Sequence, residues 1–417
     1  MSPKSNFKNV KGTRDLLPEE AVKWKGVENI IRKKMELYNF QEIRFPTFES
    51  TELFRKSTGE STDIVRKEMF TFKDMGNRSL TLKPEGTPSV VRMFLQHGLF
   101  NRGAIQKFYY IERMFRQEKP QKGRYREFRQ FGAEVIGSSS AETDGELVKT
   151  AWDIFSALDI KGVKLNINSI GCPKCRKNFV KELKSFLKGK LPELCEDCNR
   201  RYKENPMRIL DCKKDKRKIK DAPLPSDFLC EECKEHFENF KKWLDFLKID
   251  FNVDKQLVRG LDYYTKTVFE FVSSNLGSQN EVGGGGRYDE LISYMGGEKT
   301  PASGYAVGID RLMLLLPEGE EKLSVDIYLV TFDPESDLIG SKIINSLRGK
   351  GFSCDKDPMS RSVKAQFREA DRQNARWVII IGEDERKKGV IQLKDMNKGE
   401  QKEVSMQIDK ILKELKC

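Results

Sequence analysis

The chain has 417 residues, of which 38% are hydrophobic and 34% charged, so it can build buried cores, and about 100–200 residues per domain predicts two or three domains. No run approaches the ~18–20 consecutive apolar residues of a membrane-spanning helix, and the polar start Met1–Lys4 has no apolar stretch like that of a signal peptide, so we expect a cytoplasmic protein without a membrane partner. A formal net charge of +12 and a pI near 9.1 favour a polyanionic partner, because Lys and Arg displace counterions from phosphates, although a soluble protein with a basic surface would carry the same charge.

In the N-terminal half, apolar spacing predicts helices that alternate with short strands. Pro46 should end the first strand, and Pro88 suits the first turn of a helix. The elements expected in chain order are a helix over 19–38, strands at Gln41–Phe45, Met69–Phe72 and Leu80–Leu82, a helix from Thr87 to about Gln96, strands at Ala104–Ile111 and Phe128–Ile136 around a basic loop, a helix at Ala141–Leu158 and a strand at Val163–Ile167.

The character of the chain changes at Gly171, and from there to about Asp250 it is rich in Lys and Cys and largely helical. Beyond this insert we expect strands at Phe251–Leu257, Thr267–Val272 and Glu281–Gly284, a strand, Gly and helix over Gly304–Leu316, an acidic linker at Pro317–Lys322, strands at Ile327–Thr331 and Trp377–Ile381, and helices at Leu338–Arg348 and Val363–Asn374. These elements predict an α+β body with a mostly antiparallel sheet, and a C-terminal α/β domain with a mostly parallel sheet.

Arginines gather at two places that suit a nucleotide. The loop Arg116–Arg126 should lie at one edge of the sheet, where the planar forks of its arginines can bind phosphate oxygens and Phe128 can stack on a purine. Arg311 follows Gly308 at the start of a helix and can face a ligand there. Taken alone, the loop is equally typical of a solvated turn, and Arg311 of a surface side chain on an amphipathic helix.

Seven of the nine cysteines lie between Cys172 and Cys233, which in a reducing compartment indicates a metal site or buried thiols rather than disulfides. The candidate ligands form the pairs Cys172 and Cys175, Cys195 and Cys198, and Cys230 and Cys233, with Cys212 between the last two. Two such pairs, for example the first two with 19 residues between them, fit a tetrahedral structural zinc site. The spacing does not decide which two pairs share the ion, and His236 is a possible substitute ligand.

Three separated segments together resemble the signature motifs of class II aminoacyl-tRNA synthetases. Pro46 stands where motif 1 has its proline, the stretch from Phe115-Arg116-x-Glu118 to Phe128 is similar to motif 2, and Gly308–Arg311 is similar to motif 3. Neither a Gly-x-x-x-x-Gly-Lys-Ser/Thr loop nor a Gly-x-Gly-x-x-Gly sequence is present, so the other common nucleotide folds are not indicated.

Within that class, Leu257–Thr265 and Gly284–Asp289 resemble the two peptides special to histidyl-tRNA synthetases. Glu85–Thr87, the loop Glu118–Arg126, and Gln130 with Glu134 fit the same family, and the resemblance begins at Lys11–Asp15 and runs to the C-terminal domain. It implies a class II catalytic domain at 1–322, with its insert at about 171–250, and an anticodon-binding domain at 325–417. The implied enzyme is a homodimeric ligase that activates L-histidine with ATP and Mg²⁺ and passes it to the 3′ end of tRNA(His), with the motif 1 helix and strand at the dimer interface.

The resemblance also implies residue roles. Arg259 and Arg116 would be catalytic and stabilise charge at the α-phosphate; ATP would contact Arg116, Glu118, Arg124, Phe128 and Arg311; and histidine would contact Glu85, Gly86, Thr87, Arg116, Gln130, Glu134, Arg259, Tyr263 and Tyr264. Glu134 and Tyr264 would address the imidazole, whose donor and acceptor a carboxylate and a phenol can read. Strand alternation by itself gives a narrower expectation than the resemblance: adjacent residues of a strand point to opposite faces, so only one of the two tyrosines, Tyr264, should face the ligand.

Two departures from the family pattern are Arg129, where many relatives have His, and Lys83, where Arg is common. Two other functions compete with the ligase. A catalytically silent relative that senses histidine and regulates ATP phosphoribosyltransferase would lack the anticodon-binding domain. A zinc-dependent nucleic-acid-binding protein would account for the charge and the cysteines, but not for the arginines and tyrosines.

Overall fold

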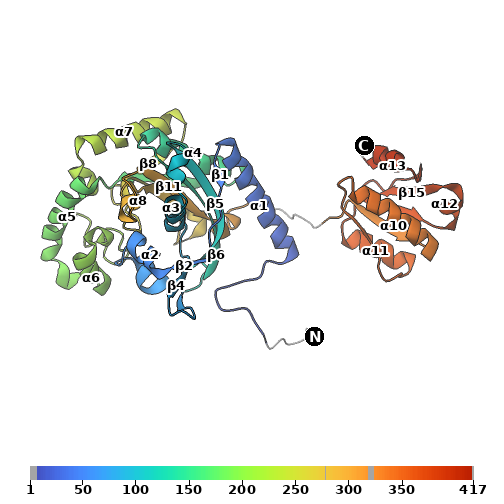
Figure 1. Cartoon of the computed structure of the whole chain (residues 1–417), viewed down its shortest axis with the longest axis horizontal. Coiled ribbons are helices and arrows are strands. Elements are labelled where there is room, and N and C mark those ends of the chain that lie inside the picture. The colour runs from blue at the N-terminus through green and yellow to red at the C-terminus, as the bar shows by residue number, and fades with distance from the viewer. Residues whose placement is uncertain (1–6, 278, 318–323, 416–417) are drawn as a thin grey trace. The chain divides into compact units, whose positions relative to one another are not determined.

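A computed structural model describes residues 7–277, 279–317 and 324–415 (Figure 1). The chain divides into two compact units, one of Met1–Asp15 with Trp24–Glu318 and one of Leu16–Lys23 with Gly319–Cys417. The start Met1–Lys4 and all but the first residue of the linker predicted at Pro317–Lys322 lie outside the described residues. No helix in the described ranges is long and apolar enough to cross a membrane.

The larger unit is built on an eight-stranded sheet of order β1-β5-β6-β11-β10-β9-β7-β8. Its inner strands pair antiparallel, as predicted, and only the outer pairs β1–β5 and β7–β8 are parallel. The strands are β1 (Gln41–Glu42), β5 (Gln106–Phe115), β6 (Glu127–Ile136), β7 (Val163–Ser169), β8 (Phe251–Val253), β9 (Thr265–Ser273), β10 (Glu281–Arg287) and β11 (Ala302–Gly308).

Helices α1 (Pro18–Leu37) and α4 (Ala141–Ala157) cover one face of this sheet. Tyr305 of β11 contacts Met35 of α1 and Thr150 of α4 through its hydroxyl, and Phe271 of β9 packs edge-on against Phe155 of α4, with ring centroids 5.2 Å apart. Because side chains alternate along a strand, the neighbours of these residues point to the other face. That face carries the site described below.

Shorter elements surround the motif 1 proline. A three-stranded sheet of order β2-β4-β3 pairs Phe48 with Leu82. Pro88 stands in the first turn of α3, as predicted. The elements are β2 (Phe48–Ser50), α2 (Thr51–Thr58), a π-helix (Ile64–Glu68), β3 (Thr71–Lys73), β4 (Ser79–Leu82) and α3 (Thr87–Gln96); α8 (Leu291–Tyr294) and α9 (Ile309–Met313) lie further along the chain.

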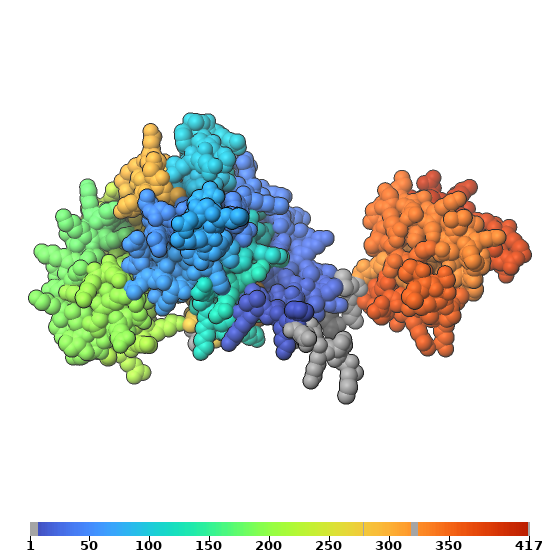
Figure 2. Space-filling view, turned by 60° about the horizontal axis from the view of Figure 1, so that its bottom comes forward, coloured from blue at the N-terminus to red at the C-terminus, as the bar shows by residue number. Residues whose placement is uncertain are grey.

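The insert is helical, as predicted, and forms the green lobe in Figure 2. Helices α5 (Pro173–Lys188), α6 (Glu196–Glu204) and α7 (Glu231–Phe246) each begin directly after a cysteine. The insert shares one hydrophobic core with the body, since Leu183 and Ile209 belong to the same buried cluster as Tyr263. The insert is therefore packed against the body and does not form a separate unit.

The C-terminal unit has a five-stranded sheet of order β13-β12-β14-β15-β16. Strand β12 is parallel to both neighbours, but β14–β15 and β15–β16 are antiparallel, so the sheet is mixed and the expectation of a mostly parallel sheet is wrong. The last two strands form a hairpin that the helical and apolar pattern did not reveal. The elements are β12 (Ile327–Thr331), α10 (Pro334–Arg348), β13 (Cys354–Lys356), α11 (Val363–Arg372), β14 (Trp377–Ile381), α12 (Glu383–Lys388), β15 (Val390–Asp395), β16 (Gln401–Ser405) and α13 (Ile408–Leu415).

Candidate active site

A cavity of about 540 Å³ lies on the open face of the large sheet. Its walls come from the β5–β6 loop, from β9, β10 and β11, from the segment 257–264, and from the insert segment 210–213 with Lys216. Of the predicted site residues, the structure brings together Glu85, Gly86, Thr87, Arg116, Glu118, Arg124, Phe128, Gln130, Arg259, Tyr263, Tyr264 and Arg311; Glu134 is the predicted residue that does not line the cavity.

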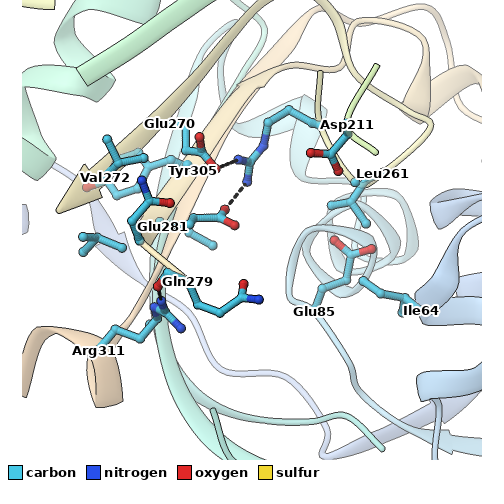
Figure 3. Close-up of a pocket in the computed structure, with 18 of the residues that line it drawn as sticks. Ile64, Glu85, Asp211, Leu261, Glu270, Val272, Gln279, Glu281, Tyr305 and Arg311 are labelled. Carbon is cyan, nitrogen blue, oxygen red and sulfur yellow. Dashed lines mark hydrogen bonds and ion pairs between the residues drawn. The ribbon is translucent and has the colours of Figure 1, made fainter. Parts of the chain in front are cut away.

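Arg259 is fixed between two carboxylates. Its guanidinium lies 2.9 Å from Glu281 Oε1 and 3.5 Å from Glu270 Oε1, and Figure 3 shows both carboxylates on one wall with Asp211 across the cavity. Burial lowers the pKa of Arg259, but the two carboxylates outweigh it and raise that pKa above its usual range, while burial and Glu281 raise the pKa of Glu270 to about 7. The site therefore keeps a permanent cation in a defined position.

The glycine run of β10 makes room for that cation. A Cβ at Gly284 would lie 2.8 Å from Arg259 Nη1, closer than van der Waals contact allows. Gly284 also pairs with Glu270 of β9. Sequence reasoning did not assign Glu270 or Glu281, although their places on the cavity face of β9 and β10 follow from strand alternation once the register is known.

Tyr263 and Tyr264 both face the cavity, and their rings lie 4.7 Å apart. The expectation that only Tyr264 does so is wrong, because the strand predicted at Phe251–Leu257 ends at Val253 and the next begins at Thr265, so the tyrosines lie in irregular backbone where alternation does not apply. The Tyr263 hydroxyl donates to Glu85 Oε2 over 2.8 Å.

Glu85 is a buried acid at the end of the cavity. The Thr58 hydroxyl donates to its second oxygen over 2.6 Å. Burial raises the pKa of Glu85, although these two hydrogen bonds act in the opposite direction. Gln130 also lines the cavity, and its buried side-chain oxygen has no hydrogen-bond partner among the described residues. An unpaired buried acceptor is costly unless a ligand donor reaches it.

Glu134 lies directly behind the cavity. Its two oxygens accept from the Thr87 hydroxyl at 2.7 Å and from the Tyr288 hydroxyl at 2.6 Å. Burial raises the pKa of Glu134 to about 8. A Cβ at Gly304, its partner on β11, would overlap the carboxylate. In this arrangement Glu134 orients Thr87, and Tyr288, which sequence reasoning left without a role, is its second partner.

The β5–β6 loop forms the other end of the cavity. Arg116 donates to the Pro84 carbonyl over 2.9 Å, and its guanidinium lies over the Phe128 ring, 5.4 Å from the centroid. Arg124 pairs with Glu118 at 3.2 Å. Burial and the nearby Arg124 lower the pKa of Arg311. Two cations that repel one another beside a cavity favour an anionic ligand between them.

The two departures from the family pattern do not reach the cavity. The Arg129 side chain pairs with Glu28 of α1 at 3.0 Å, on the helix-covered face. Lys83 contacts Glu112 at 2.8 Å and donates to the Phe45 carbonyl over 3.2 Å, which ties the motif 1 segment to β5.

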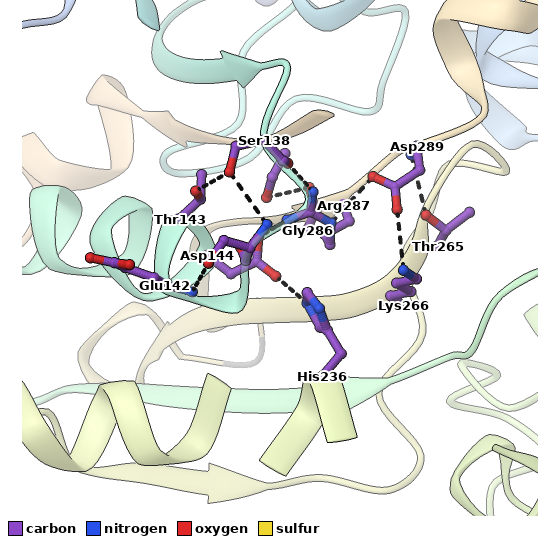
Figure 4. Close-up of polar contacts among 12 residues, drawn as sticks. Ser138, Glu142, Thr143, Asp144, His236, Thr265, Lys266, Gly286, Arg287 and Asp289 are labelled. Carbon is purple, nitrogen blue, oxygen red and sulfur yellow. Dashed lines mark hydrogen bonds and ion pairs between the residues drawn. The ribbon is translucent and has the colours of Figure 1, made fainter. Parts of the chain in front are cut away.

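Arg287, in the segment Gly284–Asp289, holds β10 against helix α4 (Figure 4). Its fully buried guanidinium pairs with Asp144 of α4 at 2.7 Å and with Asp289 at 3.2 Å, so it anchors the end of β10. His236 Nε2 lies 2.9 Å from the second oxygen of Asp144. His236 is thus engaged with α4 and does not join the cysteines, which corrects its suggested place as a metal ligand.

The cysteines of the insert fall into two groups. Cys172 and Cys175 lie with Cys230 and Cys233, whereas Cys195 and Cys198 lie with Cys212 and Asp215; in each group the potential ligand atoms all lie within 4.8 Å of one another. The first two pairs along the chain therefore do not share a site. Sequence reasoning left Cys212 outside the ligand set and missed Asp215, which the tertiary fold alone brings to these thiols.

Comparison with known proteins decides the family. A family model described as "Histidyl-tRNA synthetase" matches residues 12–312. The chain belongs to the histidyl-tRNA synthetase family. A second model, "Anticodon binding domain", matches residues 326–417, so the predicted family and its class II fold are confirmed.

Curated and solved relatives of this histidyl-tRNA synthetase family member span nearly its whole length. "Histidine--tRNA ligase" of Caldanaerobacter subterraneus subsp. tengcongensis is 47% identical over 97% of this chain and 98% of its own length. The structure of apo histidyl-tRNA synthetase of S. aureus is 36% identical with a TM-score of 0.84, covering 99% of this chain and 100% of that chain. The fold is shared with a structure described as an ATP phosphoribosyltransferase regulatory subunit/histidyl-tRNA synthetase from Bacillus halodurans C. That structure is 20% identical with a TM-score of 0.63, covering 91% of this chain and 99% of that chain.

Proposed function

We propose that this chain activates L-histidine with ATP to histidyl-adenylate and transfers the histidyl group to the 3′ end of tRNA(His). The observation that carries the proposal is Arg259, fixed by Glu270 and Glu281 in a cavity that also contains the acid Glu85 and the arginines of the β5–β6 loop. One cavity thus offers sites for an amino acid and for a polyphosphate.

We place histidine at the Glu85 end. A buried carboxylate that already accepts two hydrogen bonds can pair with the α-ammonium group, with Thr87 and the unpartnered oxygen of Gln130 beside it. Tyr264 stands where a phenol can read the imidazole. Glu134 acts from behind, because it orients the Thr87 hydroxyl.

We place ATP at the arginine end. Arg116, Arg124 and Arg311 would bind phosphate oxygens, with Glu118 positioning Arg124, and Phe128 would lie against adenine. Mg²⁺ prefers oxygen ligands and keeps phosphates as partners, and the cavity offers the carboxylates of Glu118, Glu270 and Glu281. When bound, the ion would neutralise triphosphate charge.

In the first reaction a carboxylate oxygen of histidine attacks the α-phosphorus, the bond to the β-phosphate oxygen breaks, and pyrophosphate leaves. Negative charge grows on the α-phosphate oxygens in the transition state. Arg259 and Arg116 would stabilise it with preorganised cations, which together with positioning provides the catalysis without a covalent protein intermediate.

We propose that residues 1–322 form the catalytic domain and residues 325–417 the anticodon-binding domain, in keeping with the two family matches. The net charge of +12 suits tRNA. None of the eight described cysteines forms a disulfide, as expected in the cytoplasm. The thiols of Cys172, Cys175, Cys230 and Cys233 would hold one structural zinc ion. The sulfurs of Cys172 and Cys175 lie 3.6 Å apart, near the ~3.8 Å that separates two thiolates of a zinc tetrahedron.

We also propose a homodimer that uses the motif 1 region. Phe48 and Phe72 of the small sheet are about half exposed, and their rings pack edge-on 6.3 Å apart. Exposed apolar side chains that form a patch are typical of a protein interface.

Histidine-dependent ATP–pyrophosphate exchange and charging of total tRNA test the proposal. We expect both activities to require histidine. A folded protein that binds histidine but shows neither activity would instead be a regulatory relative, although the match to an anticodon-binding domain argues against this. A folded protein that binds only nucleic acid would be the zinc-dependent nucleic-acid-binding protein.

A further inference from the structure

The second ligand group in the insert has the geometry of a metal site. Cys195 Sγ lies 3.8 Å from Cys212 Sγ, and Cys212 Sγ lies 3.8 Å from Asp215 Oδ2. Zinc–sulfur bonds of about 2.3 Å place tetrahedral thiolates about 3.8 Å apart, whereas a disulfide needs about 2.05 Å. A four-iron cluster would separate the sulfurs further, because its own atoms lie between them. The distances therefore fit one mononuclear ion.

The local structure presents these ligands together. Cys195 precedes α6 and Cys198 lies in its first turn, so the helix start fixes this pair. Asp215 Oδ2 accepts from the Cys195 backbone N–H over 2.8 Å, which draws the irregular segment after Cys212 back to α6. Cys198, Cys212 and Asp215 are buried. Asp215 Oδ1 pairs with the half-exposed Lys218 at 3.3 Å, and Oδ2 is the oxygen that faces the Cys212 thiol. A metal ion would balance the charge of three thiolates gathered beside this buried carboxylate, which one surface lysine does not neutralise.

This group, unlike the four-thiol site, is built into the cavity wall. Residues Leu210–Lys213 and Lys216 line the cavity, and Asp211 lies across from Glu270 and Glu281 (Figure 3). Cys212 is both a ligand candidate and a cavity-lining residue, and its neighbours Asp211 and Lys213 line the cavity too, so the ligand group and the cavity wall share one stretch of chain.

The same region also clamps the peptide that carries Arg259. Asn205, at the end of α6, donates to Asp262 Oδ1 over 2.7 Å. Arg208 donates to the Gly260 carbonyl. Whatever fixes α6 and the segment after it therefore also fixes residues 260–262, directly beside Arg259.

We propose that Cys195, Cys198, Cys212 and Asp215 bind a second zinc ion, and that this ion holds the insert segment 210–216 in place as a wall of the catalytic cavity. The ion is structural, because its four protein ligands complete a tetrahedron and leave no position for water or substrate. The metal-binding part is independent of the proposed function, while the effect on the cavity rests on it.

The zinc content of the full chain, purified without chelators, tests the site directly. We expect about two zinc ions per chain by elemental mass spectrometry. Cys198→Ser and Cys233→Ser should each lower the content by about one ion, and the matched control Cys354→Ser, in the C-terminal unit, should leave two. A wild-type content of one ion or fewer, iron in place of zinc, or a Cys198→Ser protein that keeps two ions would overturn the proposal.

Asp215 offers a test of geometry that does not depend on the Cys198 variant folding. Asp215→Cys completes a four-thiolate site and should keep about two ions, whereas Asp215→Ala should keep about one. Titration of unmodified protein with a mercurial, followed with a zinc-binding dye, should likewise release two ions. Release of one ion only, or two ions in the Asp215→Ala protein, would contradict the second site.

The effect on the cavity is measured by pyrophosphate exchange. Asp215→Ala should raise the KM for ATP or histidine by about tenfold, Asp215→Cys should restore it, and Cys233→Ser, which loses the other ion, should raise it less. Equal effects of Asp215→Ala and Cys233→Ser would refute the link to the cavity. If unmodified protein contains two zinc ions but shows no exchange, the proposed function fails while the metal site stands.

Discussion

Replacing Arg259 by Ala is the most direct test of the proposed chemistry. The guanidinium is nearly buried, with 13% of the side chain exposed, and two carboxylates hold it in place. Alanine removes the cation and leaves Glu270 and Glu281 facing one another across β9 and β10. Two effects should follow, one on the rate of adenylate formation and one on stability, and the structure predicts different sizes for them.

The rate effect should be large. A preorganised charged donor aimed at developing charge contributes about 10²–10³-fold to kcat, or ~2.7–4 kcal/mol. The histidine Kd should change by less than about threefold, because Glu85 is held in place by the hydroxyls of Thr58 and Tyr263 and not by Arg259. The stability loss should be smaller than the ~3–5 kcal/mol of a fully buried broken pair, because the side chain of Glu281 is 37% exposed.

Single-turnover adenylate formation and equilibrium histidine binding, measured on the same preparations, separate these quantities. The control is the double variant Arg259→Ala/Glu281→Gln, which removes the unpaired carboxylate and should recover stability but not rate. Arg259→Lys should recover part of the rate, because it keeps the charge but loses the planar fork. If Arg259→Ala weakens histidine binding as much as it slows adenylate formation, Arg259 is an anchor and the transition-state role is refuted.

Further predictions concern pH, recognition, assembly and tRNA. Burial raises the pKa of Glu134 to about 8 from an ordinary value of 4.5. The native state therefore keeps a proton that the unfolded chain loses, and the free energy of unfolding should fall as pH rises between these values. Glu134→Gln should flatten this fall in urea titrations at pH 5 and 8, and an equal change of unfolding free energy with pH in both proteins would contradict the assignment. Tyr263→Phe removes a hydrogen bond to a buried acid, worth ~1.5–3 kcal/mol, and should raise the KM for histidine at least about tenfold; an unchanged KM would place histidine elsewhere. Phe48→Glu should halve the mass seen by light scattering while Phe332→Glu, exposed in the C-terminal unit, should not; two equal masses would exclude the small sheet from the interface. The KM for tRNA should rise steeply with salt while pyrophosphate exchange changes little, and parallel losses would argue against tRNA binding through charge.

Local patterns predicted the parts of this protein that depend on neighbours in sequence. The period of apolar residues located α1, α4 and the paired strands β5 and β6, and the loop between those strands was bounded correctly at Arg116 and Arg126. The motifs also predicted most of the cavity residues, because each motif is a short continuous segment that can be recognised without knowledge of the fold. The C-terminal hairpin was missed, since a short and largely exposed strand such as β16 has a weak apolar pattern.

Tertiary structure decided what depends on residues far apart in the chain. The composition and the motifs by themselves determined the family, the two-domain plan and the arginines of the cavity. Only the fold showed that Tyr263 and Tyr264 share one side, because the backbone before β9 is irregular and alternation fails there. Only the fold paired Cys172 and Cys175 with Cys230 and Cys233 and brought Asp215 to three thiols, because side-chain partners across an insert are chosen by packing, which spacing along the chain does not encode.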